Sequence, residues 1–193
     1  LLFGNPQSDK PWNKFDNIKF LCPTPGYDRH FMMTDHLGFE MINIPMTPNG
    51  PDMDMIEELT ASDASIKGIW CTPLYSNPDG YVYSDDTVER LAKMYTAAKD
   101  FRIFWDNAYF THHLVPGKIN RISNIIKLCE KYGNTDRVYQ FSSTSKISFP
   151  GAGVSLIASS NSNIKHIQDH FKYKIICYDK MNMLRHAVVF RSK

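Results

Sequence analysis

Three short polar segments contain the residue types that covalent catalysis through a lysine requires. They supply an amide, a carboxylate, a phenol, hydroxyls and an amine, from Asn77, Asp106, Tyr109, Ser143, Ser145 and Lys146. A lysine amine can form a Schiff base with a carbonyl group, and pyridoxal phosphate is the commonest cofactor of that kind. A carboxylate can keep the pyridine nitrogen protonated, phenol and amide groups can bind the ring oxygen, and hydroxyls can hold phosphate. The combination therefore predicts a site for this cofactor.

Each of these segments follows an apolar run that is typical of a buried strand. These runs span 66–71, 101–106 and 137–143, and further strands are expected at 18–22, 39–44 and 153–159. We expect Pro23 and Pro45 to end two of them. Amphipathic stretches predict helices over 52–60, 84–100 and 119–133 and from about 161, and the alternation indicates an α/β fold, a three-layer α/β/α arrangement with a mostly parallel sheet. Ligands bind at the carboxyl ends of such strands, where the three polar segments fall.

The helix expected over 84–100 has the clearest pattern. Val88, Leu91, Ala92 and Tyr95 recur at i, i+3, i+4 and i+7, which predicts one buried face. Ser84 precedes the pattern and can cap the first turn.

Composition excludes several functional classes. A net charge of +2 over 193 residues gives no general attraction to nucleic acid or anionic membrane. No apolar run approaches the ~18 residues that a bilayer crossing needs. The four cysteines, Cys22, Cys71, Cys129 and Cys177, form no C-x-x-C pair, which favours a reducing, cytoplasmic setting. Dinucleotide-binding, P-loop and nucleophile-elbow motifs are absent from the sequence.

Longer strings resemble the fold-type-I pyridoxal-phosphate aminotransferases. They are PTPGYDRHF (23–31), IWCTPLYSNPDGYVYSDDTVERLA (69–92), WDNAY (105–109), STSKISFPGAGV (143–154) and MNMLRH (181–186). They are similar to a bacterial aspartate aminotransferase branch that lies close to the aminotransferase-like part of MocR-type proteins. The resemblance extends from about residue 17 to 190.

The resemblance implies a role for each polar residue. Lys146 would form the Schiff base and move the substrate proton, and Asp106 would pair with the pyridine nitrogen. Tyr109 and Asn77 would bind the ring oxygen. The hydroxyls of Ser143 and Ser145 would contact the phosphate. The substrates would be a small, acidic amino acid and a 2-oxo acid, and the protein would be a homodimer.

Two departures from the family pattern concern how the cofactor is held. Many members have a phosphate-binding arginine soon after the lysine, whereas residues 147–154 contain none. Many also stack an aromatic ring on the pyridine, at a position where this sequence has Thr24. Tyr27 could supply the stacking ring in its place, and the alternative is that Tyr27 has a plain packing role.

Family members are about twice as long as this sequence. Residues 1–193 therefore resemble the central part of the cofactor-binding large domain, with about 180–193 leading toward the interdomain helix. The resemblance places a phosphate loop before this segment and the substrate-carboxylate arginine after it, so we expect the segment alone to have little or no activity.

Three other functions stay open at this point. They are an eliminating lyase on the same scaffold, a cofactor-binding sensor domain of a transcription regulator, and an α/β domain without cofactor. No metal site is predicted, because neither the pair His112 and His113 nor the pair His166 and His170 has an identifiable third ligand.

Overall fold

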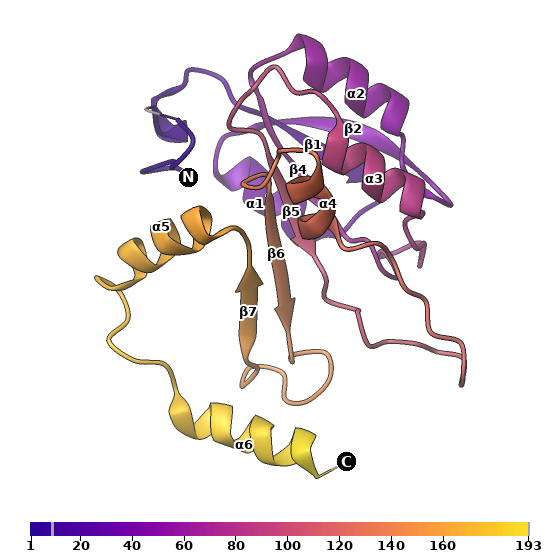
Figure 1. Ribbon diagram of the computed structural model, residues 1–193, viewed down its shortest axis with the longest axis vertical. Coiled ribbons are helices and arrows are strands. Elements are labelled where there is room, and N and C mark those ends of the chain that lie inside the picture. Colours follow the sequence, from indigo (N-terminus) through magenta and orange to yellow (C-terminus); the bar gives the residue numbers. More distant parts are fainter. Residues whose placement is uncertain (9, 193) are drawn as a thin grey trace.

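The computed structural model describes residues 1–8 and 10–192 and is built on one seven-stranded sheet (Figure 1). The strand order is β3-β2-β1-β4-β5-β6-β7. The strands are β1 (Lys19–Thr24), β2 (Glu40–Thr47), β3 (Gly50–Pro51), β4 (Ile66–Cys71), β5 (Arg102–Asp106), β6 (Val138–Ser143) and β7 (Ser155–Ala158). The strands β2, β1, β4, β5 and β6 are parallel, while β3 and β7 run antiparallel at the two edges. The α/β fold with a mostly parallel sheet is confirmed.

Helices lie on both faces of this sheet. They are η1 (Trp12–Lys14), α1 (Asp28–His36), α2 (Met53–Ser62), α3 (Asp85–Lys93), α4 (Ile125–Lys131), α5 (Asn161–Phe171) and α6 (Lys180–Arg191). Helix α6 lies beyond the strand ends, next to the loop between β6 and β7 (Figure 1). Five of the helices begin at a side-chain cap that accepts a hydrogen bond from the first turn, provided by Asp52, Ser84, Asn124, Ser160 and Asp179. Such caps satisfy backbone donors that would otherwise lack a partner.

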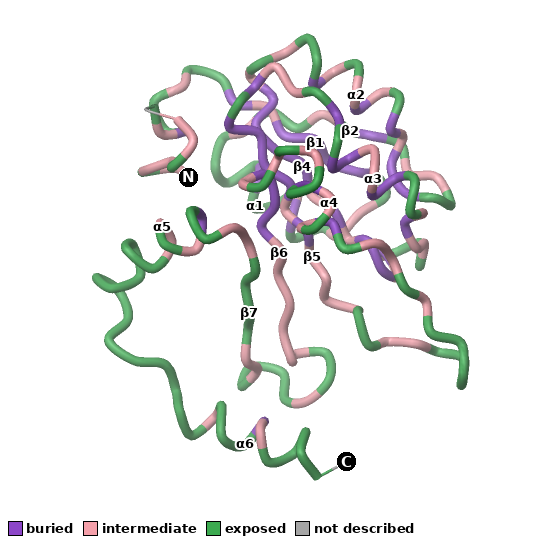
Figure 2. Tube along the Cα trace, in the orientation of Figure 1, coloured by how far each residue is buried: buried purple, intermediate pink, exposed green. Residues whose placement is uncertain are grey.

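The main core lies between the sheet and the layer formed by α2, α3 and α4 (Figure 2). Ile69 of β4, Ile103 of β5 and Leu91 of α3 are fully buried there. Burial raises the pKa of Cys22 to about 11 and that of Cys129 to about 12, so both thiols stay protonated. Both behave as small apolar side chains, as expected from the sequence.

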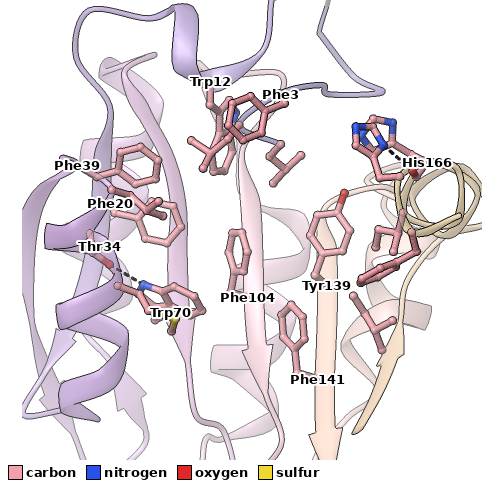
Figure 3. A pocket seen from close by; sticks show the side chains of 18 of the residues that line it. Phe3, Trp12, Phe20, Thr34, Phe39, Trp70, Phe104, Tyr139, Phe141 and His166 are labelled. Carbon is pink, nitrogen blue, oxygen red and sulfur yellow. Dashed lines mark hydrogen bonds between the residues drawn. The ribbon is translucent and has the colours of Figure 1, made fainter. Parts of the chain in front are cut away.

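The opposite face of the sheet is only partly covered, by η1, α1 and α5. An aromatic groove of about 470 Å³ remains between them (Figure 3). Phe20, Trp70 and Phe104 form its floor, and α5 forms one wall. Gly68 in β4 lets Phe20 lie flat on the sheet, since a Cβ there would lie 2.3 Å from the Phe20 ring.

Two predicted strands continue through proline. β1 includes Pro23 and β2 includes Pro45, so the expectation that these residues end their strands was wrong. The parallel pairing of β1 with β2 extends to Thr24 and Pro45. Beyond that point, Met46 and Thr47 of β2 pair with β3. A proline removes one donor from the ladder, and near a strand end the ladder tolerates that loss.

Two predicted helices are shorter than their sequence patterns. α3 ends at Lys93, and Tyr95, expected on its buried face, is 72% exposed. α4 begins only at Ile125, after the cap Asn124. The Arg137 guanidinium donates to the Met94 carbonyl at 2.8 Å and so satisfies the end of α3. This contact comes from the segment before β6, and no local pattern reveals it.

None of the helices among the described residues combines the length and the apolar character that a membrane crossing requires.

Candidate active site at the carboxyl edge of the sheet

Asp106 ends β5 and is held by a histidine from α1. His30 Nε2 lies 3.0 Å from Asp106 Oδ2, and because a carboxylate only accepts, this nitrogen carries the hydrogen. The His30 ring is stacked on Trp70 of β4, with centroids 4.5 Å and planes 7° apart. Trp70 in turn donates from Nε1 to Thr34 Oγ1 at 2.9 Å. Among the described residues, His30 is the side chain that holds Asp106, and it does so through Oδ2.

Tyr27 lies immediately before α1 and beside His30. The two rings meet edge to face, with centroids 5.3 Å apart. Tyr27, His30 and Asn77 line one small cavity. Thr24, where the family resemblance leads one to expect an aromatic ring, donates from Oγ1 to the Cys22 carbonyl at 2.9 Å.

Asn77 follows β4 in a tight loop, and a cis peptide bond joins it to Pro78. The amide of Ser76 donates to the Tyr81 carbonyl and the Tyr81 amide donates back to Ser76 Oγ, which closes the loop. Tyr83 lines the same small cavity, and burial raises the pKa of its hydroxyl well above the ordinary value. The Tyr83 hydroxyl therefore keeps its proton.

Lys146 lies in the loop between β6 and β7, beside Tyr109. Its Nζ is 5.8 Å from the centroid of the Tyr109 ring. None of the ion pairs formed by the described residues includes Lys146. Within the described residues, Lys146 is therefore held by its ring neighbour and by no carboxylate.

His112 and His113, in the loop after β5, form hydrogen bonds with the loops after β4 and β6. His112 Nε2 lies 3.2 Å from the Lys146 carbonyl oxygen, and His113 Nδ1 lies 2.7 Å from the Tyr75 hydroxyl. His112 Nδ1 is buried and has no partner among the described residues. The loop after β5 thereby contacts both the loop with Asn77 and the loop with Lys146.

The structure brings most of the sequence-predicted residues to one edge of the sheet. Asp106 is level with Phe141 in the β5–β6 register, so Ser143 ends β6 close to it. The Ser143 hydroxyl accepts from the Ser145 amide at 3.4 Å. Among the described residues, neither serine hydroxyl forms a hydrogen bond with Asp106, Tyr109 or Lys146.

Sequence reasoning missed His30. A signal was available, because His30 lies three residues after Tyr27 within the string PTPGYDRHF. Helix α1 begins at Asp28, directly after Tyr27. Residues three positions apart at a helix start lie on the same side, so His30 lies on the side of Tyr27.

The histidines that could have suggested a metal have other partners. His166 Nε2 lies 3.1 Å from the Gly4 carbonyl oxygen, and His170 Nδ1 lies 3.0 Å from the His166 carbonyl oxygen. Within residues 1–8 and 10–192, no group of three ligating side chains is arranged to hold a metal ion.

The residues at this edge fit a pyridine-type cofactor. Asp106 keeps one oxygen free of His30, and its side chain is 25% exposed, so a ring nitrogen can reach it. The buried acceptors Asn107 Oδ1 and His112 Nδ1 lack partners within the described residues, which is the pattern of a polar site whose ligand completes it. A parallel sheet that gathers Lys146, Asp106 and Tyr109 at one edge defines the fold-type-I class of pyridoxal-phosphate proteins.

Comparison with known proteins specifies the family. The family model for aspartate amino-transferases matches residues 1–193. The chain is 49% identical over 190 residues to a Mycolicibacterium smegmatis protein named as an aminotransferase, covering 98% of this chain and 44% of that protein. It is 46% identical over 189 residues to an aspartate aminotransferase of Corynebacterium glutamicum, covering 98% and 43%. The chain therefore belongs to the aspartate amino-transferase family and spans less than half the length of these relatives.

Solved structures agree with the family assignment. An aspartate transaminase from Corynebacterium glutamicum superimposes with a TM-score of 0.93 at 45% identity, over 97% of this chain and 44% of that one. Cystalysin from Treponema denticola, whose structure contains pyridoxal 5'-phosphate, matches with a TM-score of 0.61 at 22% identity, over 78% of this chain and 37% of its own. At that identity the second likeness shows the fold alone.

Proposed function

We propose that the protein containing this chain is a pyridoxal-phosphate-dependent aminotransferase. It moves an amino group between a small, acidic amino acid and a 2-oxo acid, with Lys146 as the Schiff-base lysine. The observation that carries the proposal is the position of Lys146 Nζ, 5.8 Å from the Tyr109 ring at the same sheet edge as Asp106. The name of the Corynebacterium glutamicum relative supports aspartate as the amino donor.

When bound, pyridoxal phosphate supplies an aldehyde for the lysine and a protonated ring that withdraws electrons from the reacting carbon. Lys146 would hold the cofactor covalently through its aldehyde carbon, with release of one water. Asp106 would pair with the ring nitrogen and keep it protonated. His30 holds Asp106 in place through the contact of Nε2 with Oδ2 at 3.0 Å.

The other residues orient the ring and handle the substrate proton. The Tyr109 hydroxyl and the Asn77 amide would donate to the ring oxygen, and Tyr27 would pack beside the ring. Ser143 and Ser145 would donate to phosphate oxygens. Lys146 would take the proton from the substrate α-carbon as a general base.

Borohydride reduction tests the central assignment. The full-length protein is incubated with pyridoxal phosphate, reduced, digested and mapped for the modified peptide. We expect the label on Lys146, its loss in Lys146→Arg, and normal labelling in Lys118→Arg, a matched change at an exposed lysine of the neighbouring loop. An unlabelled protein, or label spread over surface lysines, would contradict the proposal.

Product analysis separates aminotransferase activity from the alternatives. With aspartate and 2-oxoglutarate we expect a new amino acid and a new 2-oxo acid in equal amounts. An eliminating lyase would instead release a side-chain fragment. A sensor domain would bind the cofactor without turnover. Sedimentation of the same preparation tests the homodimer that the family resemblance implies.

A further inference from the structure

His186 is the only buried residue of α6. The helix lies beside the loop that joins β6 to β7, and most of its surface is exposed (Figures 1 and 2). Its apolar side chains Met181, Leu184 and Val188 are each more than half exposed, whereas His186 is 4% exposed. Contact between α6 and this loop therefore depends on His186 and its polar partners.

The imidazole of His186 binds two hydroxyls and one carbonyl group. Nε2 lies 3.0 Å from Thr144 Oγ1 and 2.7 Å from Ser148 Oγ. Nδ1 lies 2.8 Å from the Asn182 carbonyl oxygen. In a second contact, Asn182 Nδ2 donates to the Ala152 carbonyl at 2.6 Å. Helix α6 therefore contacts the loop near its start, at Thr144, and near its end, at Ala152.

These partners determine which nitrogen carries the hydrogen. A carbonyl oxygen only accepts, so Nδ1 donates to Asn182 and Nε2 of the neutral ring accepts. Thr144 Oγ1 already accepts from the Val154 amide at 2.9 Å, so its own hydrogen is available for Nε2. The single hydrogen of the Ser148 hydroxyl has two acceptors in reach, this nitrogen at 2.7 Å and the Thr144 carbonyl oxygen at 3.1 Å. Because Nε2 has one lone pair, the two hydroxyls share it.

The two hydroxyls flank Lys146 symmetrically in the sequence. Thr144 precedes the lysine by two residues and Ser148 follows it by two. The neighbouring side chains Ile147 and Phe149 are 40% and 52% exposed, so apolar packing does little to hold this segment. His186 supplies fixed points on both sides of an otherwise exposed lysine.

We propose that His186 is a positioning residue for Lys146, an inference that rests on the proposed function. By holding Thr144 and Ser148, it limits the backbone conformations from which the lysine reaches the cofactor carbonyl. Fixing a reactive group before reaction removes an entropic cost from the bond-forming step. His186 itself touches neither cofactor nor substrate.

Comparing two cofactor forms tests this role in the full-length protein. Pyridoxal phosphate can bond covalently to Lys146, whereas pyridoxamine phosphate has the same ring and phosphate but no aldehyde. His186→Phe keeps a ring against Phe149 and Phe190, which contact His186 with centroids 6.0 and 6.1 Å away, and removes both nitrogens. We expect its dissociation constant for pyridoxal phosphate to rise about tenfold, the loss of one to two ordinary hydrogen bonds, and that for pyridoxamine phosphate to change less than about twofold.

Three further variants sharpen the test. His186→Gln puts an amide oxygen near the position of Nε2 and should restore most of the affinity for pyridoxal phosphate. The double variant Thr144→Val with Ser148→Ala should reproduce the selective loss, and it also serves if His186→Phe fails to fold. His170→Phe, at an exposed histidine of α5, is the matched control and should bind both forms like the wild type.

The outcomes distinguish this inference from the proposed function. If His186→Phe weakens the binding of both cofactor forms equally, the role of His186 is purely structural. If the binding of both forms is unchanged, His186 does not affect the site. Either result overturns the inference. If the wild-type protein binds neither form, the proposed function fails as well.

Discussion

His30 joins helix α1 to the end of strand β5 by donating from Nε2 to Asp106 Oδ2 over 3.0 Å, while its ring is stacked on Trp70. Side-chain exposures of 7% for His30 and 25% for Asp106 show that the bond is largely shielded from water. Hydrogen bonds to a charged group are the stronger kind, and shielding preserves their strength. His30 therefore fixes the orientation of the carboxylate that we assign to the cofactor nitrogen.

His30→Phe should weaken cofactor binding without unfolding the protein. Phenylalanine retains the stack on Trp70 and removes the hydrogen bond, which is worth about 1.5–3 kcal/mol and corresponds to roughly ten- to a hundredfold in affinity. An absorbance titration with pyridoxal phosphate measures the change. His36→Phe, at an exposed position of the same helix, is the control. Affinity equal to the wild type in His30→Phe would show that Asp106 needs no support from α1.

Tyr75→Phe should loosen the loop that follows Tyr109. The Tyr75 hydroxyl lies 2.7 Å from His113 Nδ1 and accepts from Asn120 Nδ2 at 3.2 Å, so its removal leaves both without this partner. A loss of about 1 kcal/mol would raise the open population of the loop roughly fivefold.

Limited trypsin digestion measures that opening, because Lys118 and Arg121 are exposed cleavage sites in this loop. We expect cleavage at both to accelerate by the same factor in Tyr75→Phe. Tyr95→Phe, which removes a hydroxyl from a 72% exposed tyrosine, should digest like the wild type. No change in Tyr75→Phe would show that other contacts hold the loop.

Local sequence patterns predicted the sheet better than the helices. The strand expected over 66–71 coincides with β4, because an apolar run buried on both faces leaves a continuous signal. Helix α1 gave no such signal. Its buried residues are the polar His30 and Thr34, one turn apart, so the helix has no apolar stripe. His30 was overlooked for the same reason.

Long-range contacts explain the remaining differences. α3 ends where Arg137, from a distant segment, reaches its last carbonyl groups. His186 is the one buried residue of α6, and two of its partners, Thr144 and Ser148, lie in the loop around Lys146. The candidate residue types and their strand-end positions could be inferred from sequence. The supporting histidines were harder to recognise, because each acts through the folded arrangement, and the spacing of His30 from Tyr27 was the one signal available.

Arg137→Met should destabilise the protein markedly. The Arg137 side chain is nearly buried, and Nη1 lies 2.8, 3.3 and 3.4 Å from the carbonyl oxygens of Met94, Ala92 and Leu91. Methionine fills a similar volume but removes this donor from the Met94 and Leu91 carbonyl groups, at a cost of about 2–4 kcal/mol. The Ala92 carbonyl oxygen keeps a second donor, Asn134 Nδ2 at 2.8 Å. Urea unfolding measures the loss. Arg121→Met, at an exposed arginine, should shift the midpoint little, and an equally small shift in Arg137→Met would contradict this account.

Asp63→Asn should lower stability in a pH-dependent way. Asp63 accepts hydrogen bonds from the hydroxyl and the amide of Ser65 at 2.6 and 2.8 Å and pairs with Lys19 Nζ at 2.9 Å. These contacts, that of the Ser65 hydroxyl first, lower the pKa of Asp63 from 3.8 to about 2. A lowered carboxyl pKa stabilises the folded state fully above the unfolded pKa, and this contribution is lost as the pH falls from about 4 to about 2.

Urea unfolding at several pH values checks this dependence. The Asp63 side chain is 32% exposed, so solvent screening limits the expected loss in Asp63→Asn at neutral pH to about 1 kcal/mol. The difference from the wild type should persist down to about pH 4 and shrink toward pH 2, as the wild-type carboxylate takes up its proton. Asp16→Asn, at an exposed aspartate, should follow the wild-type curve. A difference that stays constant down to about pH 2 would mean that the charge of Asp63 does not contribute.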